Sequence, residues 1–274
     1  MIILPEIAKI TTQKKSKHRY NIFLKENEQE YYGFSVNEDI LIEYYLRKGL
    51  FLTPEMIEQI QEKDQSYKAY TLSVKYLSYR MRSEQELIDH LRRKEVDDTY
   101  IGEVISRLKQ EGLVDDVAFS EALVRTKMQT STKGPLMIKK ELVEKGIQAP
   151  NIEQALSLYT FEKQFQKVDK WAKKKLQVSS KKSRQQQIDS IKQSLLQKGF
   201  SFDVITEVLN NIELERDDDE EYEAVVFQGE KLVTKYQKKD SGYGLKQKVK
   251  AALYRKGFTA DLIDRFIDEY LSEH

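Results

Sequence analysis

The residue types that usually carry out enzymatic chemistry are scarce in this sequence. It contains no cysteine, which excludes a thiolate nucleophile, a disulfide and a zinc–thiolate site. Its three histidines, His18, His90 and His274, are too scattered to predict a catalytic triad or a zinc site. His90 precedes Leu91 in a helical pattern and is more simply interpreted as a helix-surface residue.

The carboxylates Asp217, Asp218 and Asp219 form the cluster that could be imagined as Mg²⁺ ligands of a nuclease. Consecutive helical positions point in three directions, however, and no second carboxylate cluster with a partner motif is present. The segment Gly242–Gly244 predicts a turn before a helix and is a weak signal for a phosphate-binding loop. We therefore expect a protein that is not an enzyme and uses no cofactor. A nuclease stays as an alternative. It would be revealed by metal-dependent cleavage of nucleic acid that is lost when the three aspartates are changed.

Basic side chains indicate a binding function instead. Tyr76, Tyr79 and Trp171 lie among them, so bases could stack on the rings while the cations contact phosphate. Each aromatic residue can equally be a core anchor, and the charges can simply keep the protein soluble. The candidate contacts for a protein partner or DNA are Arg80, Arg82, Arg92, Arg93, Lys94, Arg125, Lys127, Lys133, Lys139, Lys140, Lys173, Lys174, Lys181 and Lys182.

Composition limits both the architecture and the partners. A chain of 274 residues with only four prolines predicts several small units in close contact. The 33% of charged residues and 39% of hydrophobic residues suit small helical bundles better than one large globule. A net charge of +1 argues against binding nucleic acid by bulk charge alone, although local patches can still do so. Residues 1–5 are too short for a signal peptide and no apolar run approaches a membrane span, so we expect a cytoplasmic protein that binds no membrane.

The first part of the chain is the one region with a β pattern. Residues 7–10, 20–24 and 31–36 are short β-prone runs separated by polar segments, which predicts a small antiparallel meander. From residue 37 the pattern becomes helical and is expected to continue to Lys48–Gly49. Thr53–Pro54 predicts the start of the next helix, with proline in its first turn.

Strong helix boundaries follow between residues 77 and 146. Ser83 and Glu86 form a capping box that starts one helix, and Asp97 or Asp98 caps the next. Gly112 occupies the place of a left-handed C-terminal cap. Asp115 or Asp116 then caps a third helix. We expect short helices joined by tight turns.

A short pattern recurs five times after the meander. It consists of an apolar residue, two variable positions, a lysine, usually a glycine, and a second apolar residue, and its lysines are Lys48, Lys94, Lys145, Lys198 and Lys256. Each copy predicts a helix, a glycine-ended turn and a helix, because glycine adopts positive φ without steric cost. Glu95 replaces the glycine in the second copy, which predicts a differently built or slightly strained turn.

A pair of helices of this size cannot bury its own apolar stripe, so each pair is expected to gain a third helix and to stack on its neighbours. The fold class predicted is mainly α, with tandem three-helix, helix-turn-helix-like repeats forming an elongated curved rod behind a small β-meander with helices. The expected divisions are an N-terminal module over residues 1–62 and repeats over residues 63–112, 113–160, 161–214 and 215–274.

Residues 76–87, 111–119 and 133–147 closely resemble the RecX family of bacterial recombination regulators. The resemblance implies a non-enzymatic protein that binds the RecA filament on single-stranded DNA and inhibits its extension, ATPase, strand exchange and coprotease activity. It would thereby modulate DNA recombination, DNA repair and the SOS response, acting as a monomer and contacting single-stranded DNA as a second partner. The alternative is a tandem helix-turn-helix protein that acts directly on nucleic acid, for which tight, salt-dependent DNA binding without recombinase is expected.

Overall fold

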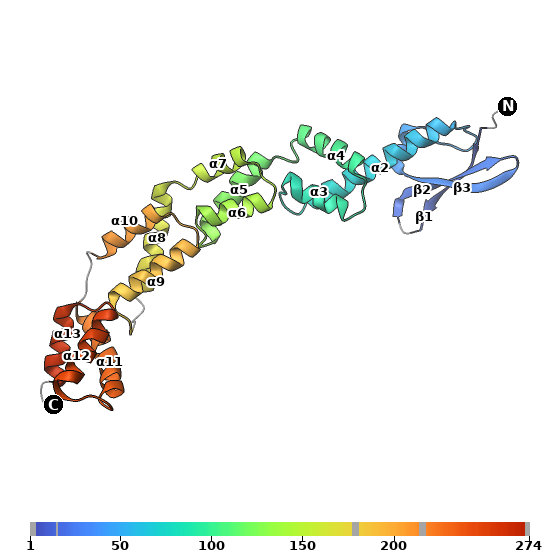
Figure 1. Cartoon of the computed structure of the whole chain (residues 1–274). Helices are drawn as coiled ribbons and strands as arrows, with labels where there is room; N and C mark the ends of the chain where they lie inside the picture. The colour runs from blue at the N-terminus through green and yellow to red at the C-terminus, as the bar shows by residue number, and fades with distance from the viewer. Residues whose placement is uncertain (1–3, 15, 177–180, 214–217, 272–274) are drawn as a thin grey trace. The chain divides into compact units, whose positions relative to one another are not determined.

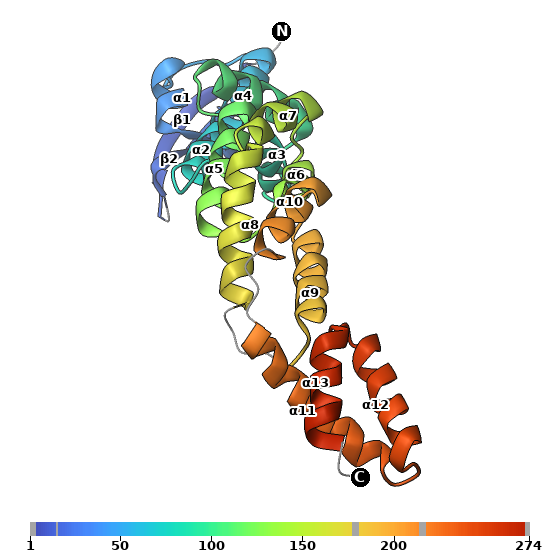
Figure 2. The same ribbon diagram turned by 90° about the vertical axis from the view of Figure 1, so that its left-hand side faces the viewer.

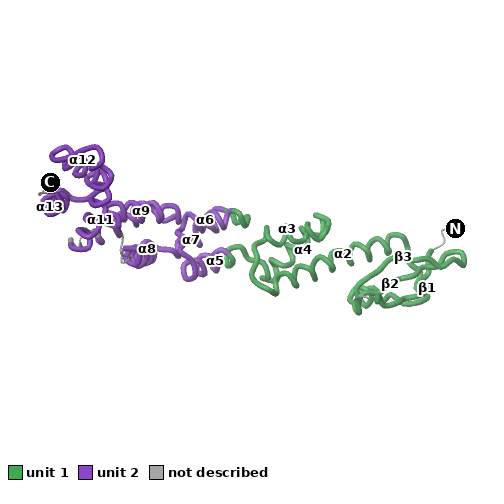
Figure 3. Tube along the Cα trace, turned by 90° about the horizontal axis from the view of Figure 1, so that it is seen from below, with its two compact units in different colours: residues 1–119, 144–148 green, residues 120–143, 149–274 purple. Residues whose placement is uncertain are grey.

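The computed structural model describes residues 4–14, 16–176, 181–213 and 218–271, and within them the chain folds into a small sheet followed by helices (Figure 1). The chain divides into two compact units. The first comprises residues 1–119 together with 144–148, and the second comprises residues 120–143 and 149–274 (Figure 3).

The sheet is the predicted antiparallel meander. Its strands β1 (Glu6–Gln13), β2 (Ser16–Glu26) and β3 (Gln29–Asn37) lie in the order β1-β2-β3. Apolar side chains alternate along the strands because successive residues point to opposite faces, and one face is buried against helices. The buried side chains of this face are Ile7, Ile22, Leu24, Phe34 and Val36.

The helix expected to reach Lys48–Gly49 is much shorter, so that prediction is wrong. Helix α1 spans only Glu38–Glu43. The chain leaves the helix because the following segment pairs with the edge of the sheet: the Gly49 amide donates to the Ile7 carbonyl at 2.9 Å, and the Ile7 amide donates to the Leu50 carbonyl at 2.9 Å. The first copy of the recurring pattern is therefore a sheet-bound turn and not a helix end.

Helix α2 (Pro54–Leu77) begins as predicted, with the Thr53 side chain accepting from the Met56 amide at 3.2 Å. It runs without interruption through residues 62–63, where a module boundary was expected, and packs on β3 as well as on later helices. Asp64 in this helix is only 2% exposed. Its carboxylate binds the Arg19 guanidinium at 2.8 Å and accepts from the Asn37 amide at 2.7 Å, which joins the helix to the sheet.

Helices α3 (Glu84–Arg92) and α4 (Asp98–Gln110) pack on each other and on α2. The capping box at Ser83 is present, and of the two aspartates considered for the next cap it is Asp97 that accepts from the Thr99 amide. The predicted left-handed cap is confirmed, with φ +69° at Gly112. Their core contains Leu87, Leu91, Ile101, Val104, Ile105 and Leu108.

Helices α5 (Asp116–Thr130), α6 (Pro135–Glu144) and α7 (Ala149–Ser157) come next. Asp115 provides the cap of α5, since its carboxylate accepts from the amides of residues 117 and 118 at 2.8 and 3.0 Å. The neighbouring Asp116 has a different role, because it accepts from the Glu84 amide at the start of α3 at 2.9 Å.

We call the helices α2–α4 the first helix triplet and α5–α7 the second. Two further helix triplets follow them. In the first of these, α10 (Phe202–Glu213) packs on both α8 (Phe161–Leu176) and α9 (Arg184–Gln197). The Lys167 ammonium of α8 donates to the carbonyls of Met128 and Ser131, where it complements the C-terminal end of α5.

In the last triplet, α11 (Asp218–Tyr236), α12 (Gly242–Arg255) and α13 (Ala260–Leu271) all contact one another (Figures 1 and 2). Helix α11 approaches α13 so closely that a Cβ on Gly229 would lie 2.3 Å from the Phe266 ring. The predicted fold class of tandem three-helix repeats behind a small antiparallel sheet is thus confirmed. None of the described helices has the length and apolar character needed to cross a membrane.

Candidate functional site

The recurring turn has one backbone conformation in its last four copies. The residue after the lysine has φ +59° at Glu95, +75° at Gly146, +84° at Gly199 and +82° at Gly257. Glu95 therefore builds the same turn as the glycines and does so with a strained backbone, which is the second of the two outcomes expected for it. We call these four segments the repeat turns.

Each of the three glycine repeat turns contacts the start of the middle helix in the preceding helix triplet. The turn at Lys145 lies on α3, where the Ser83 hydroxyl donates to the Lys145 carbonyl at 2.8 Å. A Cβ on Gly146 would lie 2.5 Å from the Cβ of Gln85. Side chains essentially never approach that closely, so this contact requires glycine for space as well as for φ.

The second contact joins the turn at Gly199 to the start of α6. The Gly134 amide donates to the Lys198 carbonyl at 2.7 Å, and the Leu136 amide donates to the Gly199 carbonyl at 3.1 Å. Two glycine backbones meet here, since a Cβ on Gly134 would lie 2.5 Å from the Gly199 carbonyl carbon. The Lys198 ammonium also donates to the Thr132 hydroxyl at 3.0 Å.

The third contact repeats the first. The Ser183 hydroxyl at the start of α9 donates to the Lys256 carbonyl. A Cβ on Gly257 would lie 2.9 Å from the Cβ of Gln185. Serine therefore serves twice at these helix starts, because Ser83 and Ser183 both cap their own helix and hold the incoming turn. The sequence pattern predicted the positive φ of the glycines but not this second requirement.

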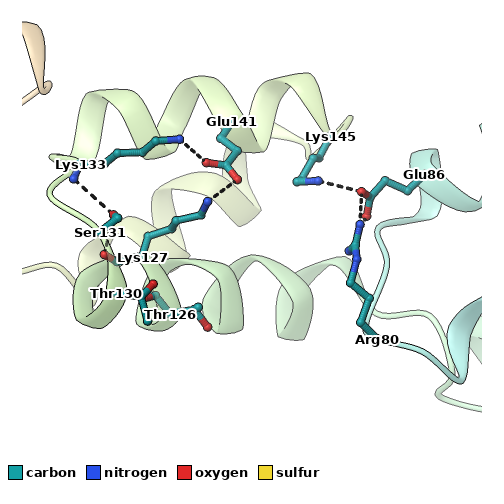
Figure 4. Close-up of polar contacts among 9 residues, drawn as sticks. All are labelled: Arg80, Glu86, Thr126, Lys127, Thr130, Ser131, Lys133, Glu141 and Lys145. Atoms are coloured by element: carbon teal, nitrogen blue, oxygen red, sulfur yellow. Dashed lines mark hydrogen bonds and ion pairs between the residues drawn. The ribbon is translucent and has the colours of Figure 1, made fainter.

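Two glutamates are each held between two cations (Figure 4). Glu86 accepts from the Arg80 guanidinium at 2.9 Å and from the Lys145 ammonium at 2.7 Å. Burial acts to raise the pKa of Glu86, but the hydrogen bonds from Arg80, Lys145 and the Ser83 amide outweigh it and lower the pKa to about 2. Arg80, one of the predicted partner contacts, is thus part of the fold.

Glu141 in α6 is the second such glutamate. It accepts from Lys127 at 2.8 Å and from Lys133 at 2.9 Å (Figure 4). Burial opposes ionisation of Glu141, yet its pKa is lowered because the hydrogen bonds from both lysines favour the carboxylate. Two more of the predicted contacts are therefore neutralised inside the fold.

Several other predicted contacts also have partners. Arg92 pairs with Asp98 at 2.9 Å and Arg125 pairs with Glu121 at 3.2 Å, both on the surface. Other predicted cations with partners include Lys173 with Asp169, Arg82 over the Tyr76 ring, Lys181 over the Phe227 ring, and Arg93 donating to the Asp89 carbonyl. Lys182 is exposed.

Four predicted contacts are exposed and have no carboxylate, ring or carbonyl partner within the described part of the chain: Lys94, Lys139, Lys140 and Lys174. We call them the unpaired lysines. Lys139 and Lys140 are neighbours on α6, between Leu136 and Val143, which are 57% and 58% exposed. Helical spacing places Leu136, Lys140 and Val143 on one face, so α6 presents a mixed apolar and cationic surface.

The aromatic candidates differ in their availability. Tyr76 packs against the α2–α4 core, with His90 stacked on it at 3.8 Å, as expected of an anchor. Trp171 is half-buried, with the Lys175 and Lys198 ammonium groups 5.7 and 5.6 Å from its ring. Tyr79 is 74% exposed and offers its ring to solvent.

The described residues contain no group of three or more metal-ligating side chains that could hold an ion. The side chains of Asp217 and Asp218, which carried the nuclease alternative, lie outside the described residues.

Family models match most of the chain. Residues 5–53 match the model described as "Regulatory protein RecX N-terminal domain". Residues 69–108 match "RecX, first three-helix domain" and residues 115–156 match "RecX, second three-helix domain". The model "RecX, third three-helix domain" matches twice, at residues 162–209 and 218–267. The last two helix triplets are therefore similar to the same family domain.

Individual proteins are similar over nearly the whole chain. The "Regulatory protein RecX" of Oceanobacillus iheyensis is 53% identical over 271 residues, which is 98% of this chain and 100% of that protein. The protein of the same name from Bacillus subtilis is 41% identical over 97% of this chain and 99% of its own length. A solved structure, "Crystal structure of regulatory protein RecX", matches with a TM-score of 0.62 and 34% identity, covering 76% of this chain and 100% of that one.

Proposed function

Because the chain belongs to the RecX family of regulatory proteins, we propose that it binds the RecA filament on single-stranded DNA and inhibits filament extension, and with it ATP hydrolysis, strand exchange and coprotease activity. Its setting would be DNA repair, recombination and the SOS response in the cytoplasm. Family membership over almost the full length is the observation that carries this proposal.

The mechanism that suits this architecture is multivalent binding. Tandem repeats present similar surfaces at regular intervals, and a filament presents identical subunits at regular intervals. Once one repeat is bound, the next binds at a high effective concentration, so weak individual contacts add up to tight binding. Such a protein selects the polymer over a free subunit, and by holding adjacent subunits it opposes the addition or rearrangement that extension requires.

The unpaired lysines are the best candidates for the contacts themselves. Cations that already bind a carboxylate, such as Arg80 or Lys127, have little remaining charge to offer a partner. Lys139 and Lys140 carry no such partner among the described residues and lie beside exposed apolar side chains. Contacts of this kind, to phosphate or to an acidic protein surface, make binding weaken as salt is raised.

The decisive experiment measures RecA ATP hydrolysis on single-stranded DNA while this protein is added at substoichiometric amounts. We expect the steady-state rate to fall well before one copy is present per RecA subunit, because one repeat protein acts on several subunits. Unchanged hydrolysis at every ratio would refute the proposal.

A tandem helix-turn-helix protein that acts on DNA directly is the competing function, supported by the exposed Tyr79 and by the unpaired lysines. Binding of this protein to single-stranded and duplex DNA in the absence of RecA separates the two. Tight binding with a steep salt dependence would favour the competitor. Weak binding together with filament inhibition would favour the recombinase regulator.

A further inference from the structure

The contact between a repeat turn and a helix start occurs three times inside this chain. Among the described residues, one repeat turn and one helix start have no such counterpart. The repeat turn Lys94–Glu95 belongs to the first helix triplet, which follows the sheet and not another triplet. The start of α12 belongs to the last triplet. The turn at Lys94–Glu95 and the start of α12 are the two halves of one further contact of this kind, which two copies of the chain could make.

The turn at Glu95 has the backbone of the docking turns. The Glu95 amide donates to the Arg92 carbonyl at 2.9 Å and the Val96 amide donates to the Leu91 carbonyl at 3.2 Å. The amides of Gly199 and of the residue after it make the same two bonds at 2.9 and 3.2 Å. A glutamate at φ +59° costs on the order of 1 kcal/mol that glycine would not. Both Lys94 and Glu95 are exposed.

The side chain of Glu95 is incompatible with docking. At the three occupied contacts, an added Cβ would lie 2.5 Å from the Gln85 Cβ, 2.7 Å from the Met137 amide nitrogen and 2.9 Å from the Gln185 Cβ. These are atoms close to the backbone, which cannot move aside as the end of a long side chain can. Any residue with a Cβ at this position therefore holds the two surfaces apart.

The start of α12 has the features of an unoccupied helix start. Ser241 is exposed and its side chain makes no capping hydrogen bond. Tyr243, at the position corresponding to Gln85 and Gln185, is 78% exposed, and open space surrounds Gly242. A helix start alone would not indicate what binds it. Here the chain itself indicates the occupant, because it places a lysine-glycine turn on each of the three equivalent starts.

We propose that the side chain of Glu95 prevents the first repeat turn from docking on the α12 start of a second copy of the chain. Docking of that kind is head-to-tail, and a head-to-tail contact that does not close into a ring continues into a polymer. The strained φ of Glu95 is then the cost of keeping separate copies apart.

The test compares full-length variants by sedimentation equilibrium across a wide range of concentrations. Glu95→Gly is expected to show an average mass that rises with concentration to at least twice the monomer mass, while the unchanged protein keeps one mass. Glu95→Ala has a Cβ but no charge and should behave like the unchanged protein if the block is steric. The double variant Glu95→Gly with Ser241→Trp should return to the mass of the unchanged protein, because the indole fills the α12 start.

Several results would overturn the proposal. Glu95→Gly could remain at the mass of the unchanged protein, or could associate equally well with Ser241→Trp present, which would place the contact elsewhere. Association of Glu95→Ala to the same extent as Glu95→Gly would remove the steric argument. Misfolding is not a concern for the central variant, because glycine relieves backbone strain, and its thermal midpoint should be at or above that of the unchanged protein.

Discussion

Glu86 shows at the scale of single residues how the tertiary structure uses charge. Its carboxylate receives Arg80 from nearby in the sequence and Lys145 from 59 positions away. Arg80 belongs to the basic set that the sequence marked for partner binding, and Lys145 belongs to the recurring lysine-glycine pattern. Their charge instead stabilises the junction at which a repeat turn meets α3.

The loss of stability caused by replacing this glutamate should depend on pH. The pKa of Glu86 is lowered to about 2 from an ordinary value of 4.5, so its contribution to stability is complete above about pH 4.5 and is lost as the pH falls through about 2. We expect Glu86→Gln to lower the free energy of unfolding by about 1–3 kcal/mol at pH 7. The difference between the two proteins should shrink between pH 4.5 and pH 2, as measured by urea unfolding.

A matched control for this measurement is Asp98→Asn, which removes the partner of Arg92 on the surface. Exposed pairs contribute little, so the loss should stay below about 0.5 kcal/mol. Equal losses of stability for the two variants would show that the two ion pairs of Glu86 contribute no more than one exposed ion pair.

The unpaired lysines give a second prediction at this scale. Charge reversal by Lys139→Glu with Lys140→Glu should raise the concentration needed for half-inhibition of RecA ATP hydrolysis by about tenfold, equivalent to about 1.4 kcal/mol. The urea midpoint should barely change, because neither side chain has a described partner. The comparison variant is Arg125→Glu, since this cation is also exposed but is paired with Glu121. If Arg125→Glu weakened inhibition as strongly as the double lysine variant, the absence of a carboxylate partner would not identify the cations that contact RecA.

Reversal of Arg92 and Arg93 is expected to weaken inhibition more than it weakens folding. Arg92 pairs with Asp98 on the surface, and Arg93 donates to a backbone carbonyl. Inhibition assays and thermal unfolding on the same double variant check this. Equal loss of both properties would remove these arginines from the proposed interface.

At the scale of elements, the turn glycines have two separable roles. Gly112 needs positive φ but has open space around it, whereas Gly199 needs positive φ and also abuts the Met137 amide. Helix starts and repeat turns therefore form one packing unit, in which the hydroxyls of Ser83 and Ser183 and the backbone of Gly134 are equivalent parts.

This distinction predicts a graded series of alanine variants, measured by chemical denaturation. Gly112→Ala should cost about 1 kcal/mol, the strain of positive φ. Gly199→Ala should cost at least about 2 kcal/mol more, because overpacking against backbone adds to the strain. Gly102→Ala, inside α4 with nothing near the new methyl group, should stabilise by about 0.5–1 kcal/mol. A loss at Gly199 no larger than that at Gly112 would contradict the close packing seen at the second contact.

At the scale of the whole molecule, inhibition should depend on the number of repeats. The last triplet has its own core, including Val225, Val249, Leu253 and Phe266, so it can be removed as a unit. A chain ending at residue 213 should still inhibit RecA, but about tenfold more protein should be needed, because one repeat contributes through effective concentration. Titration of ATP hydrolysis on long DNA measures this, with circular dichroism to verify folding. Inhibition that is unchanged, or abolished altogether, would argue against additive contacts.

Much of the fold could be predicted from sequence because its signals are local. The capping box at Ser83, the cap at Asp97, the left-handed Gly112 and the three β-prone runs each depend on residues within a few positions of one another. The recurrence of the lysine-glycine pattern predicted tandem helical units, and the resemblance to the RecX family was visible in residues 76–87, 111–119 and 133–147. The curvature of the array stays a prediction.

Tertiary structure decided the features that depend on residues distant in the sequence. The helix after the sheet ends at Glu43 because the following segment pairs with β1, which no local pattern indicates. Most of the predicted basic contacts are bound to carboxylates or rings, and only the folded chain shows that Lys139 and Lys140 are not among them. The sequence by itself determined where helices and turns form, since capping and φ preferences are short-range. It could not determine which charges remain available or why the turns need glycine for space, because both depend on which surfaces come together when the helices pack.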